Sequence, residues 1–358
     1  MRQTFAEIDL SAIRHNASAF RDLIAPSELC AVVKADGYGH GDVPVANAAL
    51  DAGATRLAVA LVEEGIRLRE AGVDVPILIL SEPDLSSVTD IAQFDLTPTV
   101  YSVRAIEGLD SVGTDINVHL KIDTGMHRVG ASPQMVHDLA EAVADSKRIK
   151  AEGVFTHFPV ADEDPRFTNQ QIDEFESIIA GLDIPLVHMA NTAGAVLFPD
   201  ARRDFCRVGL GLYGLHPCDE TRDVFDLRPA MKILSHVSHV QQLEVGARPS
   251  YGRIKALERD STVVTVPIGY ADGYSRRLTR YGSVLIGGQR FPLAGAVTMD
   301  QIVVDVGDAD VEIGDEVVLM GSQGGAEISA DELAETLETI THEIVCKIGA
   351  RVPRRYVG

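Results

Sequence analysis

Short apolar runs alternate with amphipathic stretches through the first two thirds of the chain. Hydrophobic residues recur at helical spacing in the amphipathic stretches, which predicts helices there. The clearest of these stretches are Glu63–Ala71, Pro133–Ala144 and Thr168–Ala180. An earlier helix is expected from Ser11 to about Leu23, with Asp9 or Ser11 as its N-cap.

The apolar runs between these helices are short and rich in β-branched residues, so we expect eight strands. They are Cys30–Lys34, Leu57–Ala60, Pro76–Leu80, Leu96–Val100, Ile116–Ile122, Gly153–Phe158, Leu186–Ala190 and Cys206–Leu212. Strands that alternate with helices indicate parallel βα units. Eight such units over about 200 residues predict a (β/α)₈ TIM-type barrel. A doubly wound open sheet is the alternative, but no G-x-G-x-x-G follows the first strand, which disfavours its dinucleotide-binding form.

The pattern changes after about Pro229. Short alternating strands separated by glycine turns are expected at Ser235–Leu243, Thr262–Ile268, Ser283–Ile286, Gln301–Val306 and Glu316–Met320. One helix is expected late, at Ala330–Leu337. We therefore predict two domains, a barrel over residues 1–229 and a mostly-β domain over residues 230–358.

Composition limits the partners and the compartment. The net charge of −21 disfavours nucleic acid and anionic membranes as partners, because neither attracts an acidic surface. The 358 residues include only four cysteines and no C-x-x-C pair, which favours reduced thiols in a cytosol over a disulfide framework or a zinc site. The first residues contain no apolar segment typical of a secretory signal, so a cytoplasmic protein is expected.

One lysine lies where an amine can become a nucleophile. Lys34 is one of seven lysines, and it ends the first predicted barrel strand within the sequence VVKADGYGHG (Val32–Gly41). An apolar strand end can desolvate an amine and lower its pKa, and glycines let backbone N–H groups approach an anion. A reactive lysine beside an anion site suggests pyridoxal 5'-phosphate, which has a carbonyl and a phosphate. The alternative is a surface lysine after a core strand.

Other strand ends of the predicted barrel also carry polar or cationic groups. In such a barrel, chemistry takes place at the C-terminal ends of the strands. Arg128 and His157 follow strands five and six, and Arg207 lies in strand eight. The charged guanidinium of Arg207 is costly to bury unless it is paired. A buried salt bridge to Asp204 is therefore the alternative to a role in binding a cofactor. Thr192, Gly209 and Leu210 lie after strands seven and eight, where barrels commonly bind phosphate, although Thr192 could instead be a helix N-cap.

Taken in order along the whole chain, these segments resemble the alanine racemase family, whose enzymes use pyridoxal phosphate on this fold. The resemblance rests on VVKADGYGHG, KIDTGMHRVG, THF-x-x-AD, H-x-x-N-T-A, RVGLGLYG, SYGR, GYADGY and T-M-D-Q. It implies interconversion of L- and D-alanine in the cytoplasm, which supplies D-alanine for peptidoglycan, and a homodimer with shared active sites. A racemase of another small amino acid such as serine is the alternative within the same fold.

The resemblance also implies a role for individual residues. Lys34 would hold the cofactor and act as one base, and Tyr251, from the second subunit, would act as the other. Further cofactor contacts would come from Tyr38, His157, Thr192, Arg207, Gly209 and Leu210. Arg128 and the backbone N–H of Met299 would bind the substrate carboxylate. Lys121, often carbamylated in this family, together with Asp300 and the channel residue Tyr270, would support the site, and no metal is expected.

The chain departs from the family pattern at a few positions. Thr192 replaces a common serine, Thr298 a common cysteine and Ala296 a common arginine. Ala350 stands where a phosphate-binding tyrosine can occur, so we expect a weaker grip on the phosphate, measurable as cofactor loss on dialysis.

Two hypotheses that assign a different class of function remain. One is a cofactor-binding regulatory protein of the barrel-only kind, which the β-domain with Tyr251 and Met299 disfavours. The other is a metal-dependent barrel enzyme with His157, Asp162 and Glu163 as ligands, for which the sequence has no H-E-x-x-H or tight His/Cys cluster.

Overall fold

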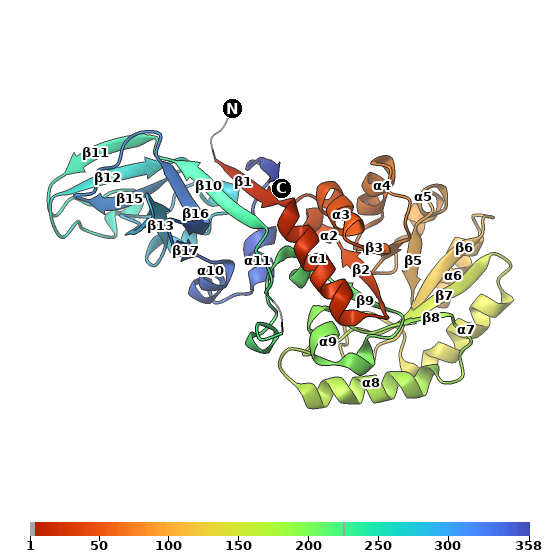
Figure 1. Ribbon diagram of the computed structural model, residues 1–358. Helices are drawn as coiled ribbons and strands as arrows, with labels where there is room; N and C mark the ends of the chain where they lie inside the picture. Colours follow the sequence, from red (N-terminus) through yellow and green to blue (C-terminus); the bar gives the residue numbers. More distant parts are fainter. Residues whose placement is uncertain (1–3, 225) are drawn as a thin grey trace. The chain divides into compact units, whose positions relative to one another are not determined.

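The computed structural model of the protein describes residues 4–224 and 226–358 (Figure 1). They form two compact units. One contains residues 11–37, 41–224 and 226–229, and the other contains residues 4–10, 38–40 and 230–358. Residues 4–10, which we expected in the barrel, thus belong to the same unit as residues 230–358.

The first unit is a parallel eight-stranded barrel, as the alternation of strands and helices predicted. Its strands follow the order β8-β7-β6-β5-β4-β3-β2-β9, and every pairing is parallel. Between β8 and β9, Arg207 N donates to Ala190 O at 3.0 Å and Asp204 N donates to Val187 O at 3.1 Å, which nearly closes the barrel. The strands are β2 Glu28–Val32, β3 Arg56–Val59, β4 Ile77–Ile79, β5 Thr97–Val100, β6 Ile116–Lys121, β7 Ile149–Phe155, β8 Leu186–His188 and β9 Phe205–Val208.

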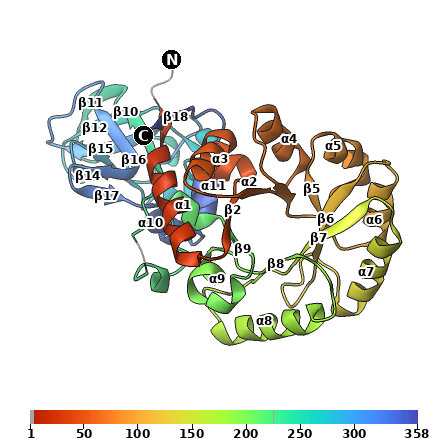
Figure 2. The same cartoon turned by 45° about the vertical axis from the view of Figure 1, so that its right-hand side comes forward.

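Helices surround these strands on the outside, as Figure 2 shows for α4 to α8. The helix α1, for example, buries Ile13, Phe20 and Ile24 at helical spacing. The helix α1 begins directly after a strand that ends at Asp9, and Ser11 lies inside it, so Ser11 is not the N-cap. The helices are α1 Leu10–Ile24, α3 Asp42–Asp51, α4 Val62–Glu70, α5 Val88–Gln93, α6 Val103–Asp110, α7 Val136–Asp145, α8 Pro165–Ile179 and α9 Thr192–Leu197.

The second unit is rich in antiparallel sheet, again as predicted. A seven-stranded sheet has the order β14-β13-β16-β10-β1-β18, with β17 beside β16, and a three-stranded sheet has the order β11-β12-β15. The first sheet contains β1 Phe5–Asp9, β10 Met231–His236, β13 Ser283–Ile286, β14 Gln289–Pro292, β16 Glu316–Gln323, β17 Ala326–Ile328 and β18 Arg354–Val357. The second contains β11 His239–Leu243, β12 Ser261–Val266 and β15 Ile302–Gly307, and the unit's helices are α10 Ala330–Leu337 and α11 Thr341–Cys346.

Several strand ends differ from their expected positions, and these differences fall near the functional residues. The strand β2 ends at Val32, so Lys34 lies beyond it, and β9 ends at Val208, so Gly209 begins the 3₁₀ turn Leu210–Tyr213. The strand predicted over Ser235–Leu243 is broken after His236.

No disulfide joins the cysteines of the described residues, which are Cys30, Cys206, Cys218 and Cys346. No helix in residues 4–224 or 226–358 is long and apolar enough to cross a membrane.

Candidate active site

The barrel gathers cationic side chains at the C-terminal ends of its strands. Lys121 is the last residue of β6 and is only 3 % exposed. Burial, and next to it the charges of Arg128, Arg207 and Lys34, lower its pKa to about 8. Burial and the same cations lower the pKa of His157 well below the ordinary value, so this ring is neutral at pH 7. The arrangement creates a strongly positive field around a neutral imidazole, which suits an anionic ligand.

The guanidinium of Arg207 is fixed inside the barrel by neutral acceptors. Its Nη2 donates to Thr156 O and Met189 O, both at 2.9 Å, and lies 3.1 Å from His157 Nδ1. No carboxylate within the described residues pairs with it. Asp204 instead accepts from Val187 N at 2.7 Å, so the salt bridge considered from the sequence is wrong. Burial lowers the pKa of Arg207 to about 10, which still leaves it charged at neutral pH.

A chain of histidines leads from Arg207 through the barrel interior. Because Arg207 Nη1 can only donate, His188 Nδ1 accepts its proton across 2.6 Å. The proton of His188 is therefore on Nε2, which donates to His119 Nδ1 at 2.8 Å. His119 then directs its Nε2–H toward Glu152 Oε2, 3.8 Å away, which is beyond direct hydrogen-bond distance. Burial lowers the pKa of both histidines, so this network assigns one tautomer to each neutral ring.

The turns after β8 and β9 meet through one hydroxyl. Thr192 Oγ1 accepts a hydrogen bond from Gly209 N at 3.1 Å, and both Thr192 and Leu210 are buried. The N-cap of α9 is Asn191, whose side chain accepts from Gly194 N at 2.9 Å. Thr192 is therefore not the N-cap, and its hydroxyl contributes to the loop pair where phosphate is expected.

Arg128 projects from an ordered loop after β6. Asp123 Oδ1 accepts from the backbone N–H groups of Gly125 and His127, both at 3.0 Å, which fixes the loop. Arg128 itself is exposed and makes no hydrogen bond or ion pair with any described residue. A guanidinium in this state is a suitable partner for a carboxylate.

The other candidate residues belong to the β-rich unit. Tyr251, Tyr270, Met299 and Asp300 line one surface hollow there. Tyr251 is 75 % exposed and lies on a tight turn in which Ser250 has a φ of 66°. The adjoining loops are tied together by Tyr270 N donating to Thr298 O at 3.0 Å, which places Tyr270 beside the Met299 segment. Asp300 accepts from Arg351 Nη2 at 2.7 Å.

Tyr38 is also assigned to this unit and is buried. Its ring centroid lies 5.8 Å from that of His342. Burial raises the pKa of Tyr38, so its phenol remains a hydrogen-bond donor at physiological pH.

Comparison with known proteins decides the family. Models of the alanine racemase N-terminal and C-terminal domains match residues 8–217 and 230–356. The chain belongs to the alanine racemase family. It is 41 % identical to an alanine racemase of Halothermothrix orenii, over 99 % of this chain and 97 % of that protein. It is also 41 % identical to alanine racemase 1 of Bacillus subtilis, over 99 % of this chain and 93 % of that protein.

Solved alanine racemase structures have the same fold. The enzyme from E. faecalis superposes with a TM-score of 0.94 at 38 % identity and covers 99 % of this chain and 98 % of its own. The enzyme from Bacillus anthracis with bound L-Ala-P gives a TM-score of 0.95 at 36 % identity, over 100 % of this chain and 96 % of its own. The chain is thus a racemase, an isomerase, built from a (β/α)₈ barrel and a mostly-β domain.

Several residues of the candidate site were not predicted from the sequence. Glu64 binds the segment that follows Lys34, and His119 and Glu152 extend the Arg207 network. For His119 and Glu152, the sequence contained one signal, which is the glycine at position 153 in a strand. A Cβ at Gly153 would lie 2.4 Å from the ring of His119, so the glycine leaves room for the imidazole.

Proposed function

We propose that this racemase interconverts L- and D-alanine with pyridoxal 5'-phosphate, as a cytoplasmic homodimer that supplies D-alanine for peptidoglycan. The single observation that carries the proposal is the cationic group of Lys34, Lys121, Arg128 and Arg207 at the strand ends around a neutral His157. A cofactor with a phosphate and a substrate with a carboxylate would supply negative charges that suit this cationic group.

The residues fit the cofactor chemically. Lys34 provides the amine, and the paired loops at Thr192, Gly209 and Leu210 provide hydroxyl and backbone groups for the phosphate. Tyr38 and His157 would complete the contacts. The bound cofactor would supply an electron sink that makes the substrate α-proton acidic.

Arg207 sets how strong that electron sink becomes. Its side chain stays protonated and donates to neutral acceptors only. Facing the pyridine nitrogen it would donate a hydrogen bond without giving up a proton, which limits the withdrawal of electrons and restrains side reactions.

Racemisation requires two groups that hold and move a proton on opposite faces of the α-carbon. We assign Nζ of Lys34 to one face and Oη of Tyr251 from the partner subunit to the other. Arg128 and the N–H of Met299 would hold the carboxylate, Lys121 and Asp300 would keep these groups in place, and Tyr270 would line the entry channel. No metal is assigned a role.

The exposure of the β-rich hollow supports the shared site. Tyr251 is 75 %, Met299 52 % and Tyr270 43 % exposed, which is unusual for large apolar or aromatic side chains in one hollow. In a dimer, the second subunit would cover these exposed side chains.

The test is racemisation of L-alanine by purified protein, with a visible spectrum and a Lys34→Ala control. We expect a yellow protein that forms D-alanine and a colourless, inactive variant. A yellow protein that racemises serine but not alanine would change the substrate, and a colourless wild type would overturn the assignment of Lys34.

A further inference from the structure

The segment after Lys34 is a left-handed helical turn. Ala35, Asp36 and Gly37 have φ/ψ values of 54/50°, 55/47° and 58/46°, and Tyr38 has a φ of 52°. Non-glycine residues rarely adopt this conformation, and a run of them is costlier still. Strain of this kind persists only where neighbouring contacts over-determine it, and it is enriched at functional sites.

Hydrogen bonds within the segment hold its far end. Gly37 N donates to Val33 O at 2.9 Å, and Gly41 N donates to Asp36 O at 2.8 Å. Asp36 Oδ1 also accepts from Asp42 N at 3.3 Å. None of these three contacts involves the N–H of Ala35, which belongs to the first peptide of the turn.

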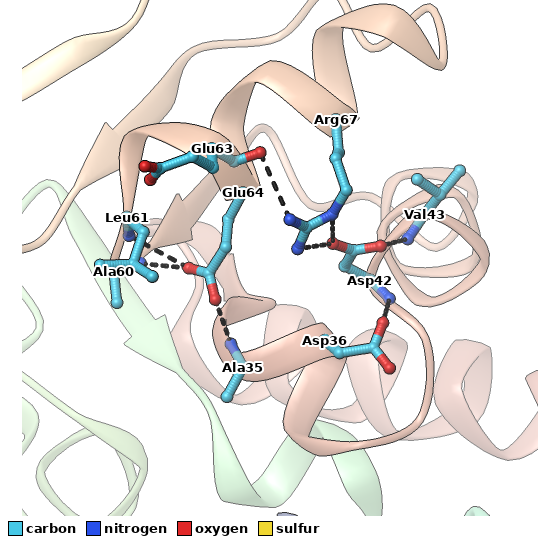
Figure 3. A network of polar contacts seen from close by, with 9 residues as sticks. All are labelled: Ala35, Asp36, Asp42, Val43, Ala60, Leu61, Glu63, Glu64 and Arg67. Atoms are coloured by element: carbon cyan, nitrogen blue, oxygen red, sulfur yellow. Dashed lines mark hydrogen bonds and ion pairs between the residues drawn. The ribbon is translucent and has the colours of Figure 1, made fainter. Parts of the chain in front are cut away.

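Glu64 of α4 binds that first peptide. Its Oε1 accepts from Ala35 N at 2.7 Å, and its Oε2 accepts from Ala60 N at 2.8 Å and Leu61 N at 3.1 Å. Figure 3 shows the carboxylate lying between Ala35 on one side and Ala60 and Leu61 on the other. Glu64 is 5 % exposed, so both oxygens bond in a buried environment where such contacts are strong.

We propose that Glu64 is a positioning residue that sets the direction of the Lys34 side chain. The N–H of Ala35 belongs to the same rigid peptide unit as the carbonyl of Lys34. Fixing that N–H fixes ψ of Lys34, and with it the path of the side chain toward the cofactor and the α-proton. The inference rests on the proposed role of Lys34 and extends it to a residue that touches neither substrate nor cofactor.

The neighbouring ion pair has a different function. Arg67 donates to Asp42 Oδ2 through Nε at 3.0 Å and Nη2 at 2.7 Å, and Asp42 Oδ1 accepts from Val43 N at 2.8 Å. This pair links α3 to α4 without touching the Lys34–Ala35 peptide. Only Glu64 among the acids in Figure 3 contacts that peptide.

Glu64→Gln tests the proposal selectively. The side-chain amide of the variant has one oxygen, which satisfies two donors when it faces Ala60 N and Leu61 N. In that orientation its NH₂ group faces Ala35 N. The hydrogen bond to the turn is then lost, whereas the start of α4 remains capped. Glu63→Gln is the matched control, because Glu63 is an exposed acid in the same helical turn.

The first readout does not need activity. In cofactor-free protein, we expect amide hydrogen exchange in residues 34–38 of Glu64→Gln to rise about tenfold, which corresponds to one lost hydrogen bond. Exchange elsewhere in the barrel, and throughout Glu63→Gln, should match the wild type. In the cofactor-bound enzyme, misplacement of the amine should lower kcat roughly tenfold or more while KM changes less.

The outcomes separate this inference from the proposed function. Unchanged exchange in residues 34–38 of Glu64→Gln would overturn the positioning role, as would a rise spread evenly over the barrel. If Glu64→Gln does not fold, Glu64→Asp provides the same exchange comparison with a shorter carboxylate, and wild-type-like exchange in residues 34–38 would likewise count against the role. A wild type that racemises no amino acid would remove the proposed function, whereas the exchange experiment would still decide whether Glu64 holds the turn.

Discussion

At the scale of single residues, the amine of Lys121 has a pKa well below its ordinary value. Burial and the nearby arginines lower its pKa to about 8, so a substantial fraction of its amine is neutral at slightly alkaline pH. A neutral amine can add carbon dioxide, and the resulting carbamate would carry negative charge beside Arg128 and Arg207. Its charge would therefore be favourable in this field.

We predict that Lys121 binds carbon dioxide. Protein equilibrated with ¹³C-bicarbonate should show one carbamate signal that grows from pH 7 to pH 9, because deprotonation supplies the reactive amine. Lys121→Arg should lack it, whereas Lys150→Arg, at an exposed site, should retain it. A signal that survives Lys121→Arg would refute the assignment.

The buried histidines predict how stability depends on pH. Burial lowers the folded-state pKa of His188 and His119, so the unfolded chain binds protons that the folded state excludes. Their contribution to stability is therefore present above the unfolded pKa of about 6.5 and is lost as the pH falls below it, by about 1.4 kcal/mol per pH unit for each ring.

This pH dependence can be assigned with one substitution. His188→Asn keeps an acceptor for Arg207 but does not titrate, so the free energy of unfolding should fall less steeply between pH 6.5 and 5.5, by about 1 kcal/mol over that interval. His137→Gln, at an exposed position, should leave the slope unchanged. Equal slopes for His188→Asn and wild type would show that folding does not lower the pKa of His188.

At the scale of elements, the sequence predicted which segments form strands better than it predicted where they end. Apolar runs identified all eight barrel strands because burial of such runs dominates their free energy. The end of β2 at Val32 depends on the left-handed turn, and only Gly37, Gly39 and Gly41 signalled it. Ala35 and Asp36 also have positive φ values, and the N–H of Ala35 is bound by Glu64, nearly thirty residues away, a separation that local sequence rules do not include.

Gly39 shows how closely this segment is packed. Its φ is +79°, and a Cβ at this position would lie 2.5 Å from Val345 O, a backbone atom that cannot move independently. Gly72, with a φ of +88°, has no atom within 4 Å of such a Cβ. The two sites share the conformational cost of a side chain but differ in steric clash.

Gly39→Ala should therefore lower the melting temperature by several degrees more than Gly72→Ala does, because the first adds an overlap of about 1 kcal/mol or more to the same backbone strain. Thermal unfolding followed by circular dichroism gives both values. Equal losses would mean that the chain near Val345 relaxes freely.

At the scale of the whole molecule, the N-terminal strand shows what local patterns leave out. The segment Phe5–Asp9 pairs antiparallel with β10 and parallel with β18, so the chain enters the β-rich unit before it forms the barrel. A boundary drawn from the change of pattern at Pro229 contains no information about such long-range pairing. The candidate site residues in the barrel could be predicted because they lie at the ends of predicted strands. Tyr251 and Met299 were predicted only from the family resemblance, because neither lies in a sequence pattern that signals catalysis.

The assignment of Lys34 and Tyr251 to different subunits makes a quantitative prediction. Lys34→Ala and Tyr251→Ala should each be nearly inactive alone. If sites are shared, a mixed dimer has one site with both defects and one with neither. Random exchange of equal amounts makes half of the dimers mixed, each with one of two sites intact, so about a quarter of the wild-type activity should return.

The experiment exchanges the two variants by mild unfolding and refolding and then measures racemisation. Refolding each variant alone controls for recovery of activity by other routes. If each site were built from one chain, every site in every mixture would contain one defect and activity would stay at the level of the single variants. The recovered fraction therefore reports whether the exposed Tyr251 of one subunit serves the lysine of the other, a point that the sequence of a single chain does not determine.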